Sequence, residues 1–166
     1  MRVKGRALVI ILLALSIISC GYTIASRASL SIDSIKIGKI INKTSEPSLQ
    51  DMLNIALVDE FQRRGVKVTD SSDNIIDADI ISYKLDLLSE KKELGLEYQT
   101  NIKVDFRVRC NGEDREYRGV TSPSIDYFAG QSALNSTAAH KQLSDKQAMD
   151  GIAFFIVTQL ALNSPK

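Results

Sequence analysis

The feature that most constrains the fold is an alternation of apolar and polar residues between positions 98 and 110. Successive side chains of a β-strand point to opposite faces, so this pattern predicts a long strand with one buried and one solvent-facing side. The apolar face would carry Tyr98, Ile102, Val104, Phe106, Val108 and Cys110. The polar face would carry Asn101, Lys103, Asp105, Arg107 and Arg109.

A hairpin is expected directly after this strand. Asn111-Gly112 is a favoured two-residue turn, although the Glu113-Asp114 that follows also allows a longer loop. The return strand is predicted over about 115–122, and Pro123 ends it. Similar alternation predicts strands over 34–41 and 80–88, and Val66 and Val68 indicate a further short strand.

A first helix is predicted over 48–64, where apolar residues recur as one stripe at helical spacing. Pro47 suits its first turn, with Ser45 or Thr44 as N-cap, and Gly65 is the expected stop.

A second helix is predicted over 138–160, and its stretch 152–157 is apolar on all sides, so we expect that stretch to be deeply buried. Gly151 within this helix either permits close packing or marks a break. The order of elements predicts an α+β domain over residues 32–166. Two helices would pack on one face of a mostly antiparallel four-stranded sheet, in the order β-α-β-β-β-α.

The N-terminus has the pattern of an export signal. Three basic residues within 1–6 precede an apolar run over 7–18, and Ser19 is a small residue at the expected cut site. The run is too short to span a bilayer, which takes about 20 residues. Ile17-Ile18-Ser19-Cys20 resembles the bacterial lipoprotein box, which implies cleavage before Cys20 and acylation of that cysteine.

On this interpretation residues 1–19 are a removed signal peptide and residues 20–31 a lipidated tether. Several acyl chains on Cys20 would supply the stable membrane attachment that one chain does not give. By resemblance to Gram-negative sorting rules, Gly21 rather than Asp at the next position implies the outer membrane, on its periplasmic face. The alternatives are an uncleaved N-terminal anchor and an ordinary signal with an incidental cysteine.

The net charge and the number of cysteines limit the classes of function that the chain can have. The formal charge is +1 at pH 7, and loss of the three basic residues of the signal peptide makes it −2. Proteins that wrap nucleic acid are strongly basic, so we expect no nucleic-acid partner. With Cys20 acylated, Cys110 has no partner for an intramolecular disulfide, and the strand pattern favours its burial.

No pattern in the sequence indicates catalysis, a metal or a cofactor. His140 is the single histidine and lacks a partner at metal-ligand spacing. No nucleophile-elbow or phosphate-binding motif is present. Asp77 and Asp79 are more simply explained as polar residues at the start of a strand than as a catalytic pair of acids. We therefore expect a protein that is not an enzyme.

Two groups of basic residues are candidates for binding phosphate or carboxylate groups. One is the polar face of the long strand, with Lys103, Arg107 and Arg109, followed by Arg115 and Arg118 near the return strand. The other is the connection that holds Lys91 and Lys92. The alternative is an ordinary charged, solvent-facing surface, which the neighbouring acidic residues favour.

The order of several short motifs resembles the LPS-assembly lipoprotein family (LptE-like). The motifs are Cys20-Gly21-Tyr22, a strand running into Asn42-Lys43-Thr44, a helix leading to Arg64-Gly65-Val66, Asp77-Ala78-Asp79, Glu97-Tyr98-Gln99, and a C-terminal amphipathic helix. The C-terminal helix departs from the family pattern, because it lacks an acid-rich, Ala-rich stretch and has an extra polar segment over 132–144.

The resemblance implies a lipid-anchored outer-membrane protein that pairs with the large β-barrel inserting lipopolysaccharide into the outer leaflet. It would act as plug and assembly aid and would also bind lipopolysaccharide. Lys91, Lys92, Arg107 and Arg109 are the candidate contacts with lipopolysaccharide or partner, chosen by charge and position. The opening strand and the helix after it also occur in periplasmic accessory lipoproteins that regulate a peptidoglycan synthase, which is the alternative function.

Overall fold

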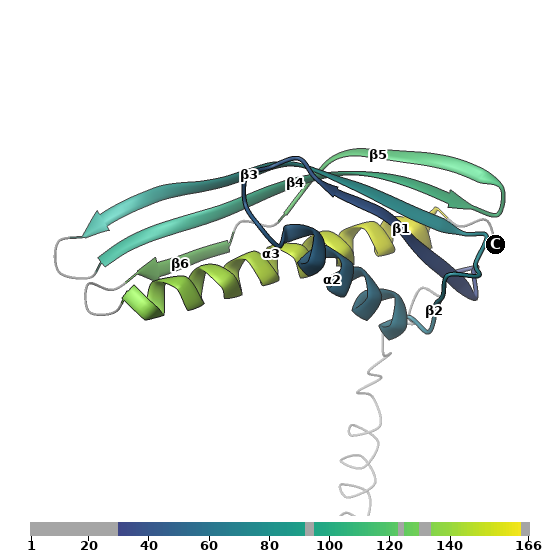
Figure 1. Ribbon diagram of the computed structural model, residues 1–166, viewed down its shortest axis with the longest axis horizontal. Helices are drawn as coiled ribbons and strands as arrows, with labels where there is room; N and C mark the ends of the chain where they lie inside the picture. The colour runs from purple at the N-terminus through teal and green to yellow at the C-terminus, as the bar shows by residue number, and fades with distance from the viewer. Residues whose placement is uncertain (1–29, 92–94, 123–124, 130–133, 164–166) are drawn as a thin grey trace, which may run out of the picture.

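The computed structural model describes residues 30–91, 95–122, 125–129 and 134–163. Cys20 and Lys92 lie outside these ranges. The elements, in chain order, are β1 (Ser34–Asn42), α2 (Leu49–Arg63), β2 (Lys67–Val68), β3 (Ile75–Lys91), β4 (Gly95–Cys110), β5 (Glu113–Thr121), β6 (Ile125–Ala129) and α3 (Leu134–Leu162). Both helices lie on one side of the sheet and leave its other side open (Figure 1).

The sheet is mixed and has six strands, which corrects the prediction of four mostly antiparallel strands. Its strand order is β2-β1-β3-β4-β5, and β6 pairs with β4. The strand β1 is parallel to both β2 and β3 because the chain returns through α2 before entering them. The pairs that β4 makes with β3, β5 and β6 are antiparallel. Within the described residues the predicted α+β class, with two helices, is confirmed.

The strand β6 was not predicted, because residues 125–129 are few and show no alternation. It continues the edge of β4 where β5 ends: β5 pairs with Lys103–Cys110 and β6 with Leu96–Thr100. Ser122 joins the two ladders. Its N–H donates to the Ile102 carbonyl at 2.8 Å, and its hydroxyl accepts the Ile102 N–H at 3.0 Å.

The predicted hairpin between β4 and β5 is confirmed as the two-residue form. Cys110 pairs with Glu113, and the turn residues Asn111 and Gly112 have φ angles of 54° and 80°. A two-residue turn of this type requires positive φ at both positions, which Asn and Gly adopt most readily.

The helix α2 ends as predicted but begins differently. Gly65 has φ 81° and donates its N–H to the Gln62 carbonyl at 2.9 Å, while Val66 donates to the Phe61 carbonyl at 3.0 Å. This is the Schellman arrangement, which glycine favours at its left-handed position.

The N-cap of α2 is Ser48, with φ 64° and no side-chain cap bond, so the prediction of Ser45 or Thr44 is wrong. Thr44 instead holds the preceding turn, since its hydroxyl donates to the Asn42 side chain at 2.8 Å and accepts the Glu46 N–H. Pro47 precedes the cap rather than occupying the first turn.

The core lies between the helices and the sheet face that bears the apolar residues of β4. Its largest fully buried side chains come from α2, α3 and strands β1, β3 and β4: Phe61, Phe106, Ile35, Leu49, Leu53, Leu57, Ile76, Ile80, Ile102, Met149, Ile152 and Ile156. The helix α3 continues without a break through Gly151.

Phe154 and Phe155 are 57% and 45% exposed, so the expectation that 152–157 is buried throughout is wrong. In a two-layer fold α3 has the sheet on one side and α2 beside it, which leaves part of its circumference in solvent. Phe154 is partly covered by the Arg64 guanidinium, 5.5 Å from its ring centre.

Gly38 allows a bulge in β1, where the register with β3 shifts between Ile37 and Ile40. The carboxylate of Asp77 accepts the Lys39 N–H at 2.6 Å there. A Cβ on Gly38 would overlap that Asp77 oxygen and lie 3.0 Å from Ile75 Cγ2.

We expect Gly38→Ala to lower the free energy of unfolding by about 1 kcal/mol, because the Asp77 carboxylate must turn away and give up its bond to the Lys39 N–H. Chemical denaturation measures it. In an Asp77→Ala background the same substitution should cost much less, because the overlapping carboxylate is gone. An equal cost in both backgrounds would contradict the proposed overlap.

Candidate functional site

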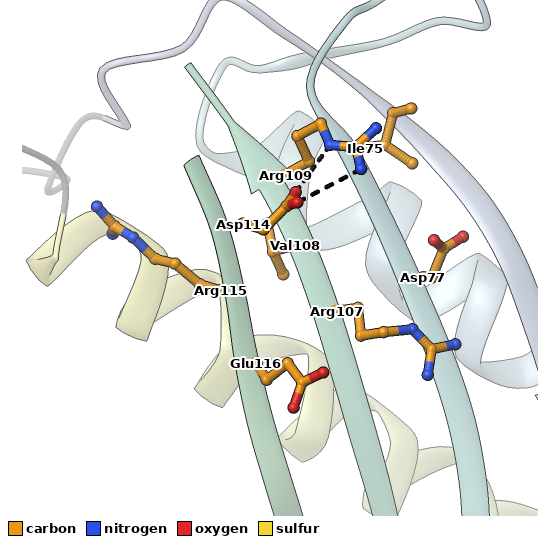
Figure 2. Close-up of a pocket in the computed structure, with 8 residues that line it drawn as sticks. All are labelled: Ile75, Asp77, Arg107, Val108, Arg109, Asp114, Arg115 and Glu116. Atoms are coloured by element: carbon orange, nitrogen blue, oxygen red, sulfur yellow. Dashed lines mark hydrogen bonds and ion pairs between the residues drawn. The ribbon is translucent and has the colours of Figure 1, made fainter. Parts of the chain in front are cut away.

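The open side of the sheet, which we call the outer face, carries charges of both signs. Its charged residues on β3, β4 and β5 include Asp77, Asp79, Lys103, Asp105, Arg107, Arg109, Asp114 and Glu116. Figure 2 shows a shallow pocket on this face, with Arg107 and Arg109 directed toward β3. The dashed contacts join Arg109 to Asp114, with Nε at 2.7 Å from Oδ1.

Asp79 is the buried member of the outer face, with a side chain only 8% exposed. Its Oδ2 accepts from Lys43 Nζ at 3.1 Å and from Arg107 Nη1 at 3.2 Å, while its Oδ1 is buried without a hydrogen-bond partner among the described residues. Burial alone would raise the pKa of Asp79, but the bonds and charges of Lys43 and Arg107 outweigh it, and the pKa lies below its ordinary value of 3.8.

This depressed pKa predicts a contribution to acid stability. A carboxyl whose pKa is lower in the folded state stabilises the fold above its unfolded pKa, and that stabilisation is lost as pH falls through the folded pKa. We therefore expect Asp79→Asn to be less stable than the parent chain at pH 7, by about 1–2 kcal/mol. The difference should shrink as pH falls below about 4. Urea titrations at several pH values measure it, and a difference independent of pH would contradict the assignment.

The four predicted contact residues do not form one site. Arg107 and Arg109 lie together on the outer face, as their alternation in β4 predicts. Lys91 ends β3, whereas Ile75, which pairs with Arg109, begins it. Sixteen strand residues of about 3.3 Å each separate these ends by roughly 50 Å. Lys92 lies outside the described residues, so no position is assigned to it.

Arg115 lies on the helix side, not on the outer face with Arg107. Its Nη1 donates to the Asn163 carbonyl at 2.7 Å and its Nη2 to Glu113 at 2.7 Å, and in Figure 2 it points away from Arg107. Arg118 is exposed and pairs with Glu116 at 2.8 Å. The four arginines that the sequence groups together are therefore divided between two faces, and each is paired with a carboxylate.

The outer face is thus suited to contact a polar surface rather than to hold a single anion. Arg107 and Arg109 each already bind a carboxylate. The pair between Arg109 and Asp114 is exposed, and such pairs contribute about 0–1 kcal/mol, so Arg109 can exchange partners at little cost. Arg107 is held more firmly, because its partner Asp79 is buried. A protein wall with both donors and acceptors satisfies such a face better than an isolated phosphate does.

A second surface lies between the helices and was not predicted. Met52, Ile55, Ala139 and Leu143 line a groove, with Ile55 and Leu143 more than half exposed. The sequence indicates this groove only through Ile55, an apolar residue that lies outside the apolar stripe of α2. Leu143 gave no such indication, because it continues the apolar spacing of α3.

A polar cluster also joins α3 to the rest of the fold. Lys141 Nζ lies 2.7 Å from Glu46 Oε1 and 2.9 Å from Asp145 Oδ2, and 5.0 Å from the centre of the Tyr83 ring. The Tyr83 hydroxyl donates to Asp145 Oδ1 at 3.1 Å. Burial is the largest cause that raises the pKa of Tyr83 to about 12. Burial lowers the pKa of Lys141, but its bonds to Glu46 and Asp145 raise it above the ordinary value.

Cys110 is half-buried and packs against the core, on the face that the alternation predicts. Burial raises the pKa of its thiol, so less thiolate is present at a given pH. We expect slow alkylation by iodoacetamide at pH 8 in the folded protein and at least tenfold faster alkylation after denaturation. Mass spectrometry over time measures both rates, and equal rates would place the thiol in open solvent.

Within the described ranges no three His, Cys, Asp or Glu residues gather as a metal site. His140 is exposed on α3. Among the same residues no helix has the length and apolar character needed to cross a membrane.

Comparison with known proteins identifies the family. The family model for lipopolysaccharide assembly, LptE, matches residues 32–160. This chain therefore belongs to the LptE family of lipopolysaccharide assembly. The resemblance drawn from the sequence motifs is confirmed.

Solved structures share the fold at low identity. A putative lipoprotein from Caulobacter crescentus is 16% identical, with 74% of this chain and 88% of that one covered and a TM-score of 0.51. Lipoprotein B from Nitrosomonas europaea is 13% identical, with 82% and 87% covered and a TM-score of 0.51. Such identities show the fold alone. No curated protein sequence matches this chain.

Proposed function

We propose that this protein is an outer-membrane lipoprotein that pairs with the β-barrel that inserts lipopolysaccharide into the outer leaflet. It would help to assemble or plug that barrel, and would thereby contribute to transport of lipopolysaccharide to the cell surface. The observation that carries the proposal is the outer face with its interspersed charges of both signs, on a fold of the lipopolysaccharide-assembly family.

The outer face suits the inside of a wide barrel. The interior of such barrels is polar and in several cases holds a plug. Arg107 and Arg109 are already paired with carboxylates, so on entering that space they bury less unpaired charge than free arginines would. The helices on the other side of the sheet keep the core closed while the outer face contacts the wall.

Acylated Cys20 would keep the domain at the membrane that holds the barrel. Nine residues separate Cys20 from Leu30, which is already part of the core. The ten steps between the two Cα atoms reach about 36 Å at most when the chain is fully extended. The anchor would therefore restrict the domain to the periplasmic layer next to the outer membrane and leave it free to turn its outer face toward a partner.

Depletion of the protein tests the function. We expect lipopolysaccharide to disappear from the cell surface and large antibiotics to enter, while peptidoglycan synthesis continues at its normal rate. Surface labelling of lipopolysaccharide and incorporation of a labelled cell-wall precursor measure the two processes. Slowed precursor incorporation with normal surface lipopolysaccharide would contradict the proposal and favour a regulator of a peptidoglycan synthase.

A pair of charge reversals tests the proposed surface. Arg109→Glu changes an exposed residue of the outer face, and Lys146→Glu makes the same charge change on exposed α3, where Lys146 pairs with Asp150. We expect Arg109→Glu to reduce recovery of the barrel severalfold and Lys146→Glu to leave it unchanged. Equal effects of both variants would show that the outer face is not the contact.

A further inference from the structure

One edge of β3 is open over half its length. The strand β1 pairs with β3 only as far as Ile80, where the Lys43 N–H donates to the Ile80 carbonyl at 2.9 Å. The strand β3 continues to Lys91 with β4 on its other side. Beyond Ile80, no strand in the part of the chain that the structure describes pairs with this edge (Figure 1).

The alternation of the backbone shows which groups face the open edge. The Ile102 carbonyl accepts from Ser122 on the β5 side of β4, so its neighbours Asn101 and Lys103 present their backbone groups to β3. These pair with Lys84 and Ser82. The N–H and C=O groups of the alternate residues, 83, 85 and 87, therefore point to the open edge.

This edge has only part of the usual protection against pairing. Natural proteins shield exposed edges with proline, bulges, charged side chains (lysine above all) or a covering segment. The register of β3 shifts at 80/82 and again at 87/89, but the stretch between them is regular and contains no proline, and its exposed charges, Lys84 and Asp86, are of opposite sign. Leu85, in the middle of that stretch, is 38% exposed. The stretch 82–87 is therefore a ready template for another strand.

We propose that this edge pairs with the same edge of a second copy of the chain. The two β3 strands would run antiparallel about a two-fold axis at Leu85. Leu85 would lie opposite Leu85 of the second copy, and residue 83 opposite residue 87. These are the positions whose backbone groups point outward, so the pair would form about six backbone hydrogen bonds. The two-fold symmetry closes this contact at two copies, because each copy uses its β3 edge once.

Charge selects this register. With Leu85 on the axis, exposed Lys84 faces exposed Asp86 of the second copy, and this pair occurs twice. If one strand slipped by two residues relative to the other, Lys84 would lie opposite Lys84 of the second copy. A slip of two residues in the opposite direction would place Asp86 opposite Asp86 of the second copy. Opposite charges across strands stabilise and like charges destabilise, so both slipped registers are disfavoured.

The two sides of the strand pair would differ in character. Tyr83 contacts Asp145 of α3 and therefore lies on the helix side of the sheet, and Leu85 follows it on that side. Lys84 and Asp86 lie on the side of the outer face. The pair would thus cover Leu85 on the helix side and place its ion pairs next to the outer face.

The contact is small, so we expect a weak, concentration-dependent dimer. Stable interfaces bury about 1,200–2,000 Å² in total, which a short strand pair does not reach.

Co-purification of two differently tagged copies of the full chain from detergent-solubilised membranes tests the proposal. Lys84→Asp places Asp opposite Asp86, and Asp86→Lys places Lys opposite Lys84. We expect each variant paired with itself to lower recovery of the second tag at least fivefold. Lys84→Asp paired with Asp86→Lys should restore recovery, because both cross-strand pairs are then opposite in charge.

Leu85→Pro is a second, independent variant. It removes the edge N–H at the two-fold axis, which β4 does not use, so thermal unfolding should change little while recovery of the second copy is lost. The proposal would be overturned if two Lys84→Asp copies co-purified as well as two parent copies do. It would also be overturned if no second tagged copy co-purified with the parent chain. Recovery of a different protein through this edge would overturn it as well.

Discussion

Lys141→Ala is expected to lower the free energy of unfolding by about 3 kcal/mol, because it leaves buried charge without a partner. Lys141 is the cation between Glu46, in the loop after β1, and Asp145 on its own helix. The Asp145 side chain is 4% exposed and retains only the Tyr83 hydroxyl when Lys141 is lost. Chemical denaturation measures the change, and the melting temperature should fall by roughly 10 °C.

Lys146→Ala is the matched control. Lys146 lies on the same helix and also pairs with an acid four residues later, Asp150, but it is exposed. Exposed pairs of this kind contribute about 0.3–0.5 kcal/mol. Equal losses for the two variants would show that the cluster around Lys141 is no more than a surface ion pair.

Cys20→Ser is expected to release nearly all of the protein from the outer membrane or to block its maturation. A side chain without acyl groups gives no hydrophobic attachment, and among the described residues no helix can replace it. Membrane fractionation with immunoblotting measures the distribution. Cys110→Ser is the control, since it changes the other cysteine of the chain and should stay with the membrane.

A Cys20→Ser protein that remains in the outer membrane after a salt wash would contradict lipid anchoring as the sole attachment. Contacts with the barrel could then hold the domain in place. If a correctly folded soluble form loses its partner completely, the anchor is required for pairing as well as for location.

The parts of the fold that depend on local pattern were predictable. The alternation of apolar and polar residues predicted the buried face of β4, from Ile102 to Val108, and Asn111-Gly112 predicted the hairpin. The strand pairing of β1 was not predictable, because parallel or antiparallel pairing depends on how α2 returns the chain and not on the residues of β1. Ser48 was missed as N-cap because it caps through backbone geometry and not through its side chain.

The candidate site was predictable only in part. Arg107 and Arg109 share a face because they are two residues apart in one strand. Lys91 was grouped with them by charge, whereas the length of β3 places it at the other end of the sheet. The cluster of Lys141, Glu46 and Tyr83 joins residues far apart in the chain, and no local pattern marks it.

Affinity purification of the tagged full chain from solubilised outer membranes tests the central claim most directly, with the bound proteins identified by mass spectrometry. The account predicts recovery of a large outer-membrane β-barrel in near-equal amount, reduced by Arg109→Glu and not by Lys146→Glu. Recovery of a penicillin-binding peptidoglycan synthase without any barrel would contradict it.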